Sequence, residues 1–257
     1  MRFFQNRVEW LNKIRSIEFD IIFNKNINKR FHRALDLGAG EGFSSYRLNS
    51  ISNFVFATDY NKSRLARIRS NQINRIVCDA EHLCFKKKQF DLVFSSNLLE
   101  HVLHPNQVLK NIYEILSDDG FVVITVPNRI WKILHLIFFY PNQMGSLIRR
   151  LFFSAQYEIQ ESWSSNVKTK SRYSFLRRNI WPVPHGISKN NWSEFFTFSR
   201  NYWIKMFREN NFTLIREVNN LPLYSAYPLA CLSTVLSALS RLSLSSSHAF
   251  ILNKTKI

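Results

Sequence analysis

Three glycines at alternate positions follow a short apolar run, and their spacing could support chemistry. The stretch 34–42 is ALDLGAGEG. An apolar run that ends in such glycines predicts a strand, a tight turn and the start of a helix. Glycine lets a ligand approach the main chain closely, and the N–H groups that open the helix favour an anionic group. The stretch therefore predicts a nucleotide-type site, although a plain strand–turn–helix would show the same glycines.

An acidic residue, Asp59, follows the glycine turn at a position suited to bind the ribose of a nucleotide. Asp59 ends an apolar run at 53–59, about 20 residues beyond the glycines, which is the spacing at which a carboxylate meets ribose hydroxyls in nucleotide-binding α/β units. A carboxylate can accept hydrogen bonds from two vicinal hydroxyls at once. Asp59 could instead cap the helix expected to begin near Asn61. After this glycine turn, ribose binding is the interpretation that we adopt.

Two further polar side chains stand at predicted strand ends. Asp79 follows a strand predicted at 75–78, with a loop cap as its alternative role, and Asn97 ends a strand predicted at 90–97. Ligands of parallel sheets bind outside the carboxyl ends of the strands. We therefore expect Asp79 and Asn97 to share one edge of a sheet with Asp36 and Asp59.

Two histidines are candidates for a catalytic base. Imidazole can accept a proton from a hydroxyl group near neutral pH. His101 follows the strand that ends at Asn97, and His185 lies in a Pro-rich stretch further along the chain. His101 is the preferred candidate, and a structural role is its alternative. Glu100 and His101 alone supply too few ligands to predict a metal ion.

The spacing of apolar runs predicts the elements that position these residues. Five buried strands that alternate with helices predict an α/β fold, a Rossmann-like doubly wound sheet. A sixth strand and an antiparallel seventh would complete a seven-stranded sheet, with a helical insertion between the fifth and sixth. The predicted strands lie near 34–37, 53–59, 75–78, 90–97, 121–126, 212–218 and 249–253, the predicted helices at 43–51, 62–71, 105–116 and 192–210, and a turn at 118–120.

Residues 33–128 resemble a class I S-adenosylmethionine-dependent methyltransferase of the small-molecule, methyltransferase type 11-like kind. Four motifs in order carry the resemblance: the glycine turn after Asp36, the acid at Asp59, DAEHLCF at 79–85 and FDLVFSSNLLEHV at 90–102. Cys84 stands where proline is usual. The resemblance implies S-adenosylmethionine as cofactor and direct displacement of its methyl group. It also implies cofactor contacts at Asp36, Gly38, Ala39, Gly40, Gly42, Asp59, Tyr60, Asp79, Ala80 and Asn97.

Three regions are predicted along the chain. Residues 1–30 form an N-terminal helical extension, residues 31–128 and 191–257 the methyltransferase core, and residues 129–190 an insertion. In the resembling family such insertions commonly form the lid or the acceptor pocket. The insertion could instead be a helical subdomain that packs on itself, or a segment that contacts a membrane interface. A leucine stripe at 229–242 predicts an amphipathic helix.

Composition limits the partners. The net charge of +17 and the pI near 10.1 favour an anionic partner such as an anionic membrane surface or nucleic acid, although coding bias would also scatter basic residues. The three cysteines form no disulfide framework, and no signal peptide or spanning helix is predicted. We therefore expect a cytoplasmic protein that is either free or peripheral on the inner face of a membrane.

These observations predict an enzyme that methylates a small-molecule or lipid- or glycan-linked acceptor, on oxygen in the first instance. An RNA methyltransferase that uses the basic surface is one alternative. The fourth strand ends in Ser-Asn-Leu rather than in the Pro-Pro-aromatic motif of exocyclic-amine enzymes, which weighs against it. A non-catalytic protein that binds the cofactor through this fold is the other alternative, and the intact glycine turn weighs against it.

Overall fold

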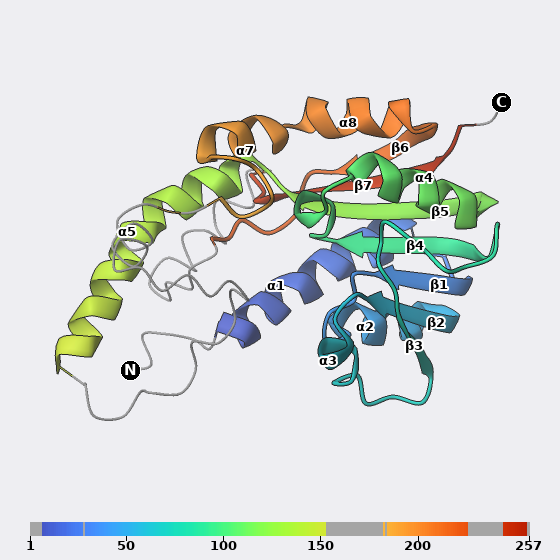
Figure 1. Ribbon diagram of the computed structural model, residues 1–257, viewed down its shortest axis with the longest axis horizontal. Coiled ribbons are helices and arrows are strands. Elements are labelled where there is room, and N and C mark those ends of the chain that lie inside the picture. Colours follow the sequence, from blue (N-terminus) through green and yellow to red (C-terminus); the bar gives the residue numbers. More distant parts are fainter. Residues whose placement is uncertain (1–6, 28, 153–181, 183, 226–243, 256–257) are drawn as a thin grey trace.

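A seven-stranded sheet forms the centre of the molecule (Figure 1). The computed structural model describes residues 7–27, 29–152, 182, 184–225 and 244–255. The strand order is β3-β2-β1-β4-β5-β7-β6, with β7 antiparallel to both of its neighbours and the first five strands parallel. The strands are β1 Phe31–Leu37, β2 Ser52–Asp59, β3 Ile73–Val77, β4 Phe90–Ser96, β5 Leu116–Pro127, β6 Phe212–Val218 and β7 Ser247–Lys254. The predicted fold class is confirmed.

Helices cover both faces of the sheet, which is why its central strands are apolar on both sides. The helices are α1 Arg7–Ile22, α2 Phe43–Ile51, α3 Lys62–Leu65, α4 Pro105–Ile115, α5 Arg129–Phe152, α7 Asn191–Thr197 and α8 Arg200–Glu209. Short helical turns lie at Phe23–Ile27 and Leu99–His101. One apolar cluster joins α4 and α8 to the sheet, and a second joins α1 and α2 to the opposite face. Adjacent β4 residues, Leu92 and Val93, belong to different clusters, as the two-residue period of a strand requires.

The N-terminal helix is part of this core. Phe19 and Phe23 lie with ring centroids 4.4 Å apart, and Phe23 packs on Phe94 of β4 at 5.7 Å. All three side chains are buried. Burial of each such side chain contributes about 1.5–3 kcal/mol. Within residues 1–30 the predicted helix is observed as α1, and it packs against the sheet.

Local hydrogen bonding changes two predicted helices. The predicted helix at 62–71 ends early, because the N–H of Ile68 bonds to the carbonyl three residues before it and the Ile68 side chain turns into the core. The predicted helix at 192–210 is two helices, α7 and α8. The Ser199 hydroxyl accepts the N–H of Tyr202 and starts the second helix as its N-cap.

The turn predicted at 118–120 lies inside β5. Phe90 pairs with Leu116 and Leu92 pairs with Phe121, so the residues between them form an irregularity in the register. The strand therefore begins earlier than the apolar run alone indicates, and an irregularity in its pairing with β4 takes the place of the predicted turn.

The insertion begins with α5, which extends away from the sheet on the left of Figure 1. Residues 153–181 and 183 of the insertion, the leucine stripe at 229–242 and Cys231 lie outside the described residues. In the part of the chain that the structure describes, no helix is both long enough and apolar enough to cross a membrane.

Candidate functional site

The glycine turn lies where the direction of chain winding in the sheet reverses, because β1 is flanked by β2 and β4. Open α/β sheets bind their ligands at such a point. The N–H groups of Gly38 and Ala39 both donate to the carbonyl of Thr58, at 2.9 and 2.8 Å. A Cβ added to Gly40 would meet nothing within 4 Å, so the space beside this residue is open to a ligand.

Gly42 has a different reason to be glycine. Its φ is +85°, a left-handed conformation, and an added Cβ would lie 2.5 Å from Cγ1 of buried Ile68. This glycine is required for packing of the turn on the core. The predicted site motif therefore contains both a position open to a ligand and a position fixed by the fold.

Asp36 is buried beneath the turn. Its carboxylate accepts the hydroxyl groups of Ser44 at 3.1 Å and Ser45 at 2.5 Å, which joins the end of β1 to the first turn of α2. Burial raises the pKa of Asp36 to about 6, against the lowering effect of the two serines. These contacts give Asp36 a role in holding the glycine turn, beside the cofactor contact that the resemblance implies.

Asp59 is bonded directly to the glycine turn. Its Oδ2 accepts the N–H of Gly40 at 2.9 Å, and its Oδ1 accepts the N–H of Asn61 at 2.8 Å. Each carboxylate oxygen has a second acceptor position, so both ribose hydroxyls could still bind. Asn61, not Asp59, caps α3 by accepting the N–H groups of its first turn. The side chain of Tyr60 is exposed.

The Asp79–Ala80 segment follows β3. The carboxylate of Asp79 is largely exposed and accepts the N–H of Glu81 at 2.9 Å, a loop-capping contact. The carbonyl of Ala80 accepts Nδ2 of Asn111 at 3.1 Å, which fixes the backbone beside the predicted adenine position. Cys84, at the usual proline position, donates its thiol to Cys78 with the sulfur atoms 3.2 Å apart.

Asn97 lies immediately after β4 in a left-handed conformation, with φ of +50°. Its N–H donates to the carbonyl of Thr125 at 2.9 Å, and its side chain donates to Ser96 Oγ at 3.2 Å. Asparagine is among the few residues that adopt this conformation readily. The predicted Asp36, Asp59, Asp79 and Asn97 thus all stand at carboxyl ends of parallel strands.

Beyond Asn97 the structure brings three potential ligand atoms together. One ligand atom each from Glu100, His101 and His185 lies within 4.8 Å of the others. The two imidazole rings are 4.7 Å apart, and Oε1 of Glu100 is 3.9 Å from Nε2 of His101. Both histidines reach the surface, whereas Glu100 is buried. The sequence predicted His101 and His185 separately and gave no sign that they meet.

Burial controls the charge of this cluster. It raises the pKa of Glu100 to about 8 and lowers the pKa of His101. No other residue in the described part of the chain hydrogen bonds to either carboxylate oxygen of Glu100. A buried carboxyl group without such partners is costly, and its place beside two imidazoles calls for a functional explanation.

A buried network holds His185 in place. The carboxylate of Glu194, on α7, accepts the backbone N–H groups of His185 at 2.5 Å and Gly186 at 2.8 Å, and it pairs with Lys132 of α5. Lys132 and Glu194 are both fully buried. The N–H of Ile187 donates to the carbonyl of Glu100 at 3.1 Å. Lys132 and Glu194 could not be predicted as part of the site, because a single lysine and a single glutamate carry no sequence signal of mutual burial.

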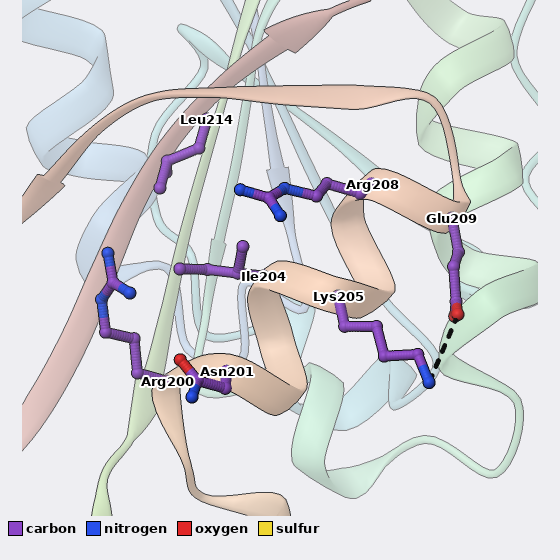
Figure 2. Close-up of a pocket in the computed structure, with 7 residues that line it drawn as sticks. All are labelled: Arg200, Asn201, Ile204, Lys205, Arg208, Glu209 and Leu214. Carbon is purple, nitrogen blue, oxygen red and sulfur yellow. Dashed lines mark ion pairs between the residues drawn. The ribbon is translucent and has the colours of Figure 1, made fainter.

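The hollow drawn in Figure 2 lies elsewhere, on the outer face of α8 and β6. It encloses about 320 Å³ and is lined by Arg200, Asn201, Ile204, Lys205, Arg208, Glu209 and Leu214. None of the residues of the glycine turn or of the histidine cluster lines it. The chemistry of the strand ends, not the volume of this hollow, therefore defines the candidate site.

The fold is the Rossmann-like fold of class I S-adenosylmethionine-dependent methyltransferases. It shows the strand order, the glycine turn and the acid at the end of β2. Residues 35–124 match the family model described as a methyltransferase domain. Residues 35–124 therefore belong to a methyltransferase domain, as the motifs predicted. An S-adenosylmethionine-dependent methyltransferase from Mesorhizobium loti has a similar structure, with a TM-score of 0.53 over 88% of this chain and 92% of that chain at 14% identity.

Curated relatives match the same region. The human mitochondrial arginine-hydroxylase NDUFAF5 is 35% identical over 102 residues, which are 38% of this chain and 29% of that protein. A ubiquinone biosynthesis O-methyltransferase from Bradyrhizobium diazoefficiens is 26% identical over 105 residues, 39% of this chain and 42% of that one. The chain thus spans less than half the length of these relatives. The family match and the methyltransferase relatives support a methyltransferase domain that uses S-adenosylmethionine within this region.

Proposed function

We propose that the protein transfers the methyl group of S-adenosylmethionine to an oxygen atom of a small-molecule or lipid- or glycan-linked acceptor. The observation that carries the proposal is the meeting of His101 and His185 just beyond the end of β4, where the resemblance expects the transferable methyl near Asn97. Two imidazoles beside a methyl donor are suited to a hydroxyl acceptor, which must lose a proton. The name of the O-methyltransferase relative agrees with this choice.

The cofactor would lie along the strand ends. The open space at Gly40 admits its close approach, Asp59 accepts its ribose hydroxyls, and Asp79 with the backbone of Ala80 meets its adenine. Asn97 would lie near the methyl group, as the resemblance implies. The protein then acts mainly by aligning the sulfonium with the acceptor, a proximity effect.

His101 is the proposed base. Because burial lowers the pKa of His101, its imidazole is neutral at pH 7 and can accept a proton. When bound, S-adenosylmethionine would supply its methyl group to the acceptor oxygen by direct displacement, and the electron pair of the broken carbon–sulfur bond would return to sulfur. The imidazole of His101 would take the hydroxyl proton.

The acceptor would enter from the side of residues 129–190. The described part of this insertion supplies α5 and the His185 segment, and the segment is bonded to the backbone of Glu100. The insertion therefore adjoins the proposed base, as a lid or acceptor pocket would. An anionic membrane surface is the proposed partner of the basic protein when the acceptor is lipid-linked.

RNA methylation remains the competing proposal, and the charge favours it. The net charge is +17, and Arg200, Lys205 and Arg208 line the hollow in Figure 2. Basic surfaces of this kind bind phosphate backbones in a salt-dependent manner.

Transfer of labelled methyl from S-adenosylmethionine into a host extract distinguishes these proposals. The extract is separated into lipid, small-molecule, protein and RNA fractions, and Asp59→Asn serves as the cofactor-deficient control. We expect label in the lipid or small-molecule fraction with the wild-type protein only. Label in RNA would overturn the acceptor proposal. An absence of label together with an absence of S-adenosylhomocysteine binding would favour a non-catalytic protein.

A further inference from the structure

We propose that Glu100, His101 and His185 form a binding site for one divalent transition-metal cation. One ligand atom from each of the three residues lies within 4.8 Å of the others. Two imidazole nitrogens and one carboxylate oxygen form a donor set that manganese, iron, cobalt and zinc accept, with coordination positions left for water or an acceptor. This site concerns binding of a cation and does not depend on whether methyl transfer occurs.

The carboxylate supplies an observation independent of the clustering. The Glu100 side chain is 2% exposed, and no other residue in the described ranges hydrogen bonds to either of its oxygens. Buried carboxylates normally have hydrogen-bond partners, bind a cation or lie in an ion pair. The imidazoles of His101 and His185 lie beside this carboxylate. Nε2 of His101 is 3.9 Å from Oε1 of Glu100, which is too far for a hydrogen bond. A cation between the three groups would supply the partner that the Glu100 side chain otherwise lacks.

Small movements of the side chains would complete the geometry. Ligand atoms that bind one ion at about 2.1 Å lie at most about 4.2 Å apart. The observed separations reach 4.8 Å. Rotation of the two imidazoles, which reach the surface, closes this difference without movement of buried Glu100. Their exposure also gives a cation a path from solvent.

The backbone on both sides of the cluster is fixed. Glu194 holds the N–H groups of His185 and Gly186, and buried Lys132 holds Glu194. Such contacts around a metal site set the orientation of its ligands. The contact with Glu194 is made by the backbone N–H of His185 and not by its imidazole.

A cation here would change how the histidines take part in the proposed reaction. A bound divalent cation lowers the pKa of an oxygen that coordinates it. His101 and His185 would then act as its ligands, and the acceptor hydroxyl would be activated at the same place. This consequence rests on the proposed function, whereas the cation site stands on the cluster alone.

Binding of Mn²⁺ to untagged protein, after treatment with EDTA, tests the site. Mn²⁺ is chosen because thiols such as Cys78 and Cys84 bind it poorly. Loss of the electron paramagnetic resonance signal of free Mn²⁺ reports binding directly. We expect about one Mn²⁺ per chain, and an affinity at least ~10-fold weaker in Glu100→Gln and in His185→Asn. His104→Asn, which changes a nearby exposed histidine outside the cluster, should bind as wild type does.

Two controls keep the result interpretable. Circular dichroism tests whether each variant is folded. If Glu100→Gln does not fold, His185→Asn alone tests the site. Calorimetry measures binding of S-adenosylhomocysteine separately from binding of Mn²⁺. A failure of the methyltransferase proposal can therefore be distinguished from a failure of the cation-site proposal. No Mn²⁺ binding by the wild-type protein, or equal binding by wild type and His185→Asn, would overturn the proposal.

Discussion

Gly186 packs directly on the backbone of Glu100. A Cβ on Gly186 would lie 2.2 Å from the carbonyl oxygen of Glu100, and the next residue donates its N–H to that same oxygen. The contact joins the end of the insertion to the turn that follows β4, and it brings His185 beside His101. The absence of a side chain at one position therefore controls the assembly of the cluster.

Gly186→Ala should separate the two parts of this cluster. The backbone carbonyl cannot move away as a flexible side chain could, so the His185 segment must shift. We expect a loss of about 1–3 kcal/mol in the free energy of unfolding and Mn²⁺ binding weakened at least ~10-fold. Chemical denaturation and the Mn²⁺ titration measure the two effects. Lys189→Ala, in the same loop but exposed, is the control, and equal behaviour of the two variants would contradict the packing argument.

Asp59→Asn should weaken binding of S-adenosylhomocysteine strongly, with a smaller loss of stability than Asp59→Ala. The amide retains an oxygen that accepts one backbone N–H, but it loses the charge and one acceptor needed by two ribose hydroxyls. We expect an affinity at least ~10-fold lower by calorimetry.

Asp59→Ala would also leave the N–H groups of Gly40 and Asn61 without their acceptor, and should cost about 1–3 kcal/mol of stability in addition. Unchanged affinity in both Asp59 variants would mean that this carboxylate does not meet the ribose.

Gly40→Ala and Gly42→Ala should affect different properties, the first mainly cofactor binding and the second mainly stability. An alanine at 42 would be strained at φ of +85° and would collide with Ile68, so we expect a loss of about 2 kcal/mol or more in stability. An alanine at 40 meets open space and should be strained only by its backbone, by about 1 kcal/mol. Its methyl group would instead obstruct the ligand. Parallel denaturation and calorimetry measure both properties, and normal cofactor binding by Gly40→Ala would place the ligand elsewhere.

The places of Asp36, Asp59, Asp79 and Asn97 at strand ends could be predicted because the sequence signals are local. Each of the acids and Asn97 stands next to the apolar run that forms its strand, and the parallel sheet then brings the strand ends together. Local competition between caps was harder to predict. Asp59 was the candidate to cap the helix expected near Asn61, and the structure shows that Asn61 caps α3 instead.

The histidine cluster could not be predicted, since it depends on contacts between distant segments. Burial of Glu100, its lack of other hydrogen-bond partners and the approach of His185 all follow from packing of the insertion on the core. The same is true of the Lys132–Glu194 pair, which links α5 to α7. The break between α7 and α8 had a local signal, the N-cap serine, that the continuous apolar pattern concealed.

The basic protein should bind anionic vesicles. Each basic residue near such a surface contributes about 1 kcal/mol, and the chain carries 35 lysines and arginines against 18 acids. We expect co-sedimentation with phosphatidylserine-containing vesicles at low salt, and loss of binding at high salt as the charges are screened. Phosphatidylcholine vesicles are the neutral control. Failure to sediment with anionic vesicles at low salt would remove the membrane as a partner.

Glu18 should make stability depend on pH. This α1 carboxyl group is buried and accepts the hydroxyl of Ser247 at 2.8 Å, and burial raises its pKa from 4.5 to about 7. Between these values the native state binds the proton more fully than the unfolded state does. Its contribution to the free energy of unfolding is therefore present at low pH and is lost as pH rises through the window.

Comparison with Glu18→Gln isolates this effect, because Asp36 and Glu100 titrate in both proteins and cancel in the difference. The glutamine oxygen can still accept the Ser247 hydroxyl, and its side chain does not ionise. We expect the stability of wild type relative to Glu18→Gln to fall by about 1 kcal/mol per pH unit from about pH 5 to about pH 7. Urea denaturation of both proteins across this range measures the difference. If the free energies of unfolding of the two proteins changed in parallel with pH, Glu18 would keep the same protonation when the protein unfolds. The expected effect of its burial between α1 and β7 on stability would then be absent.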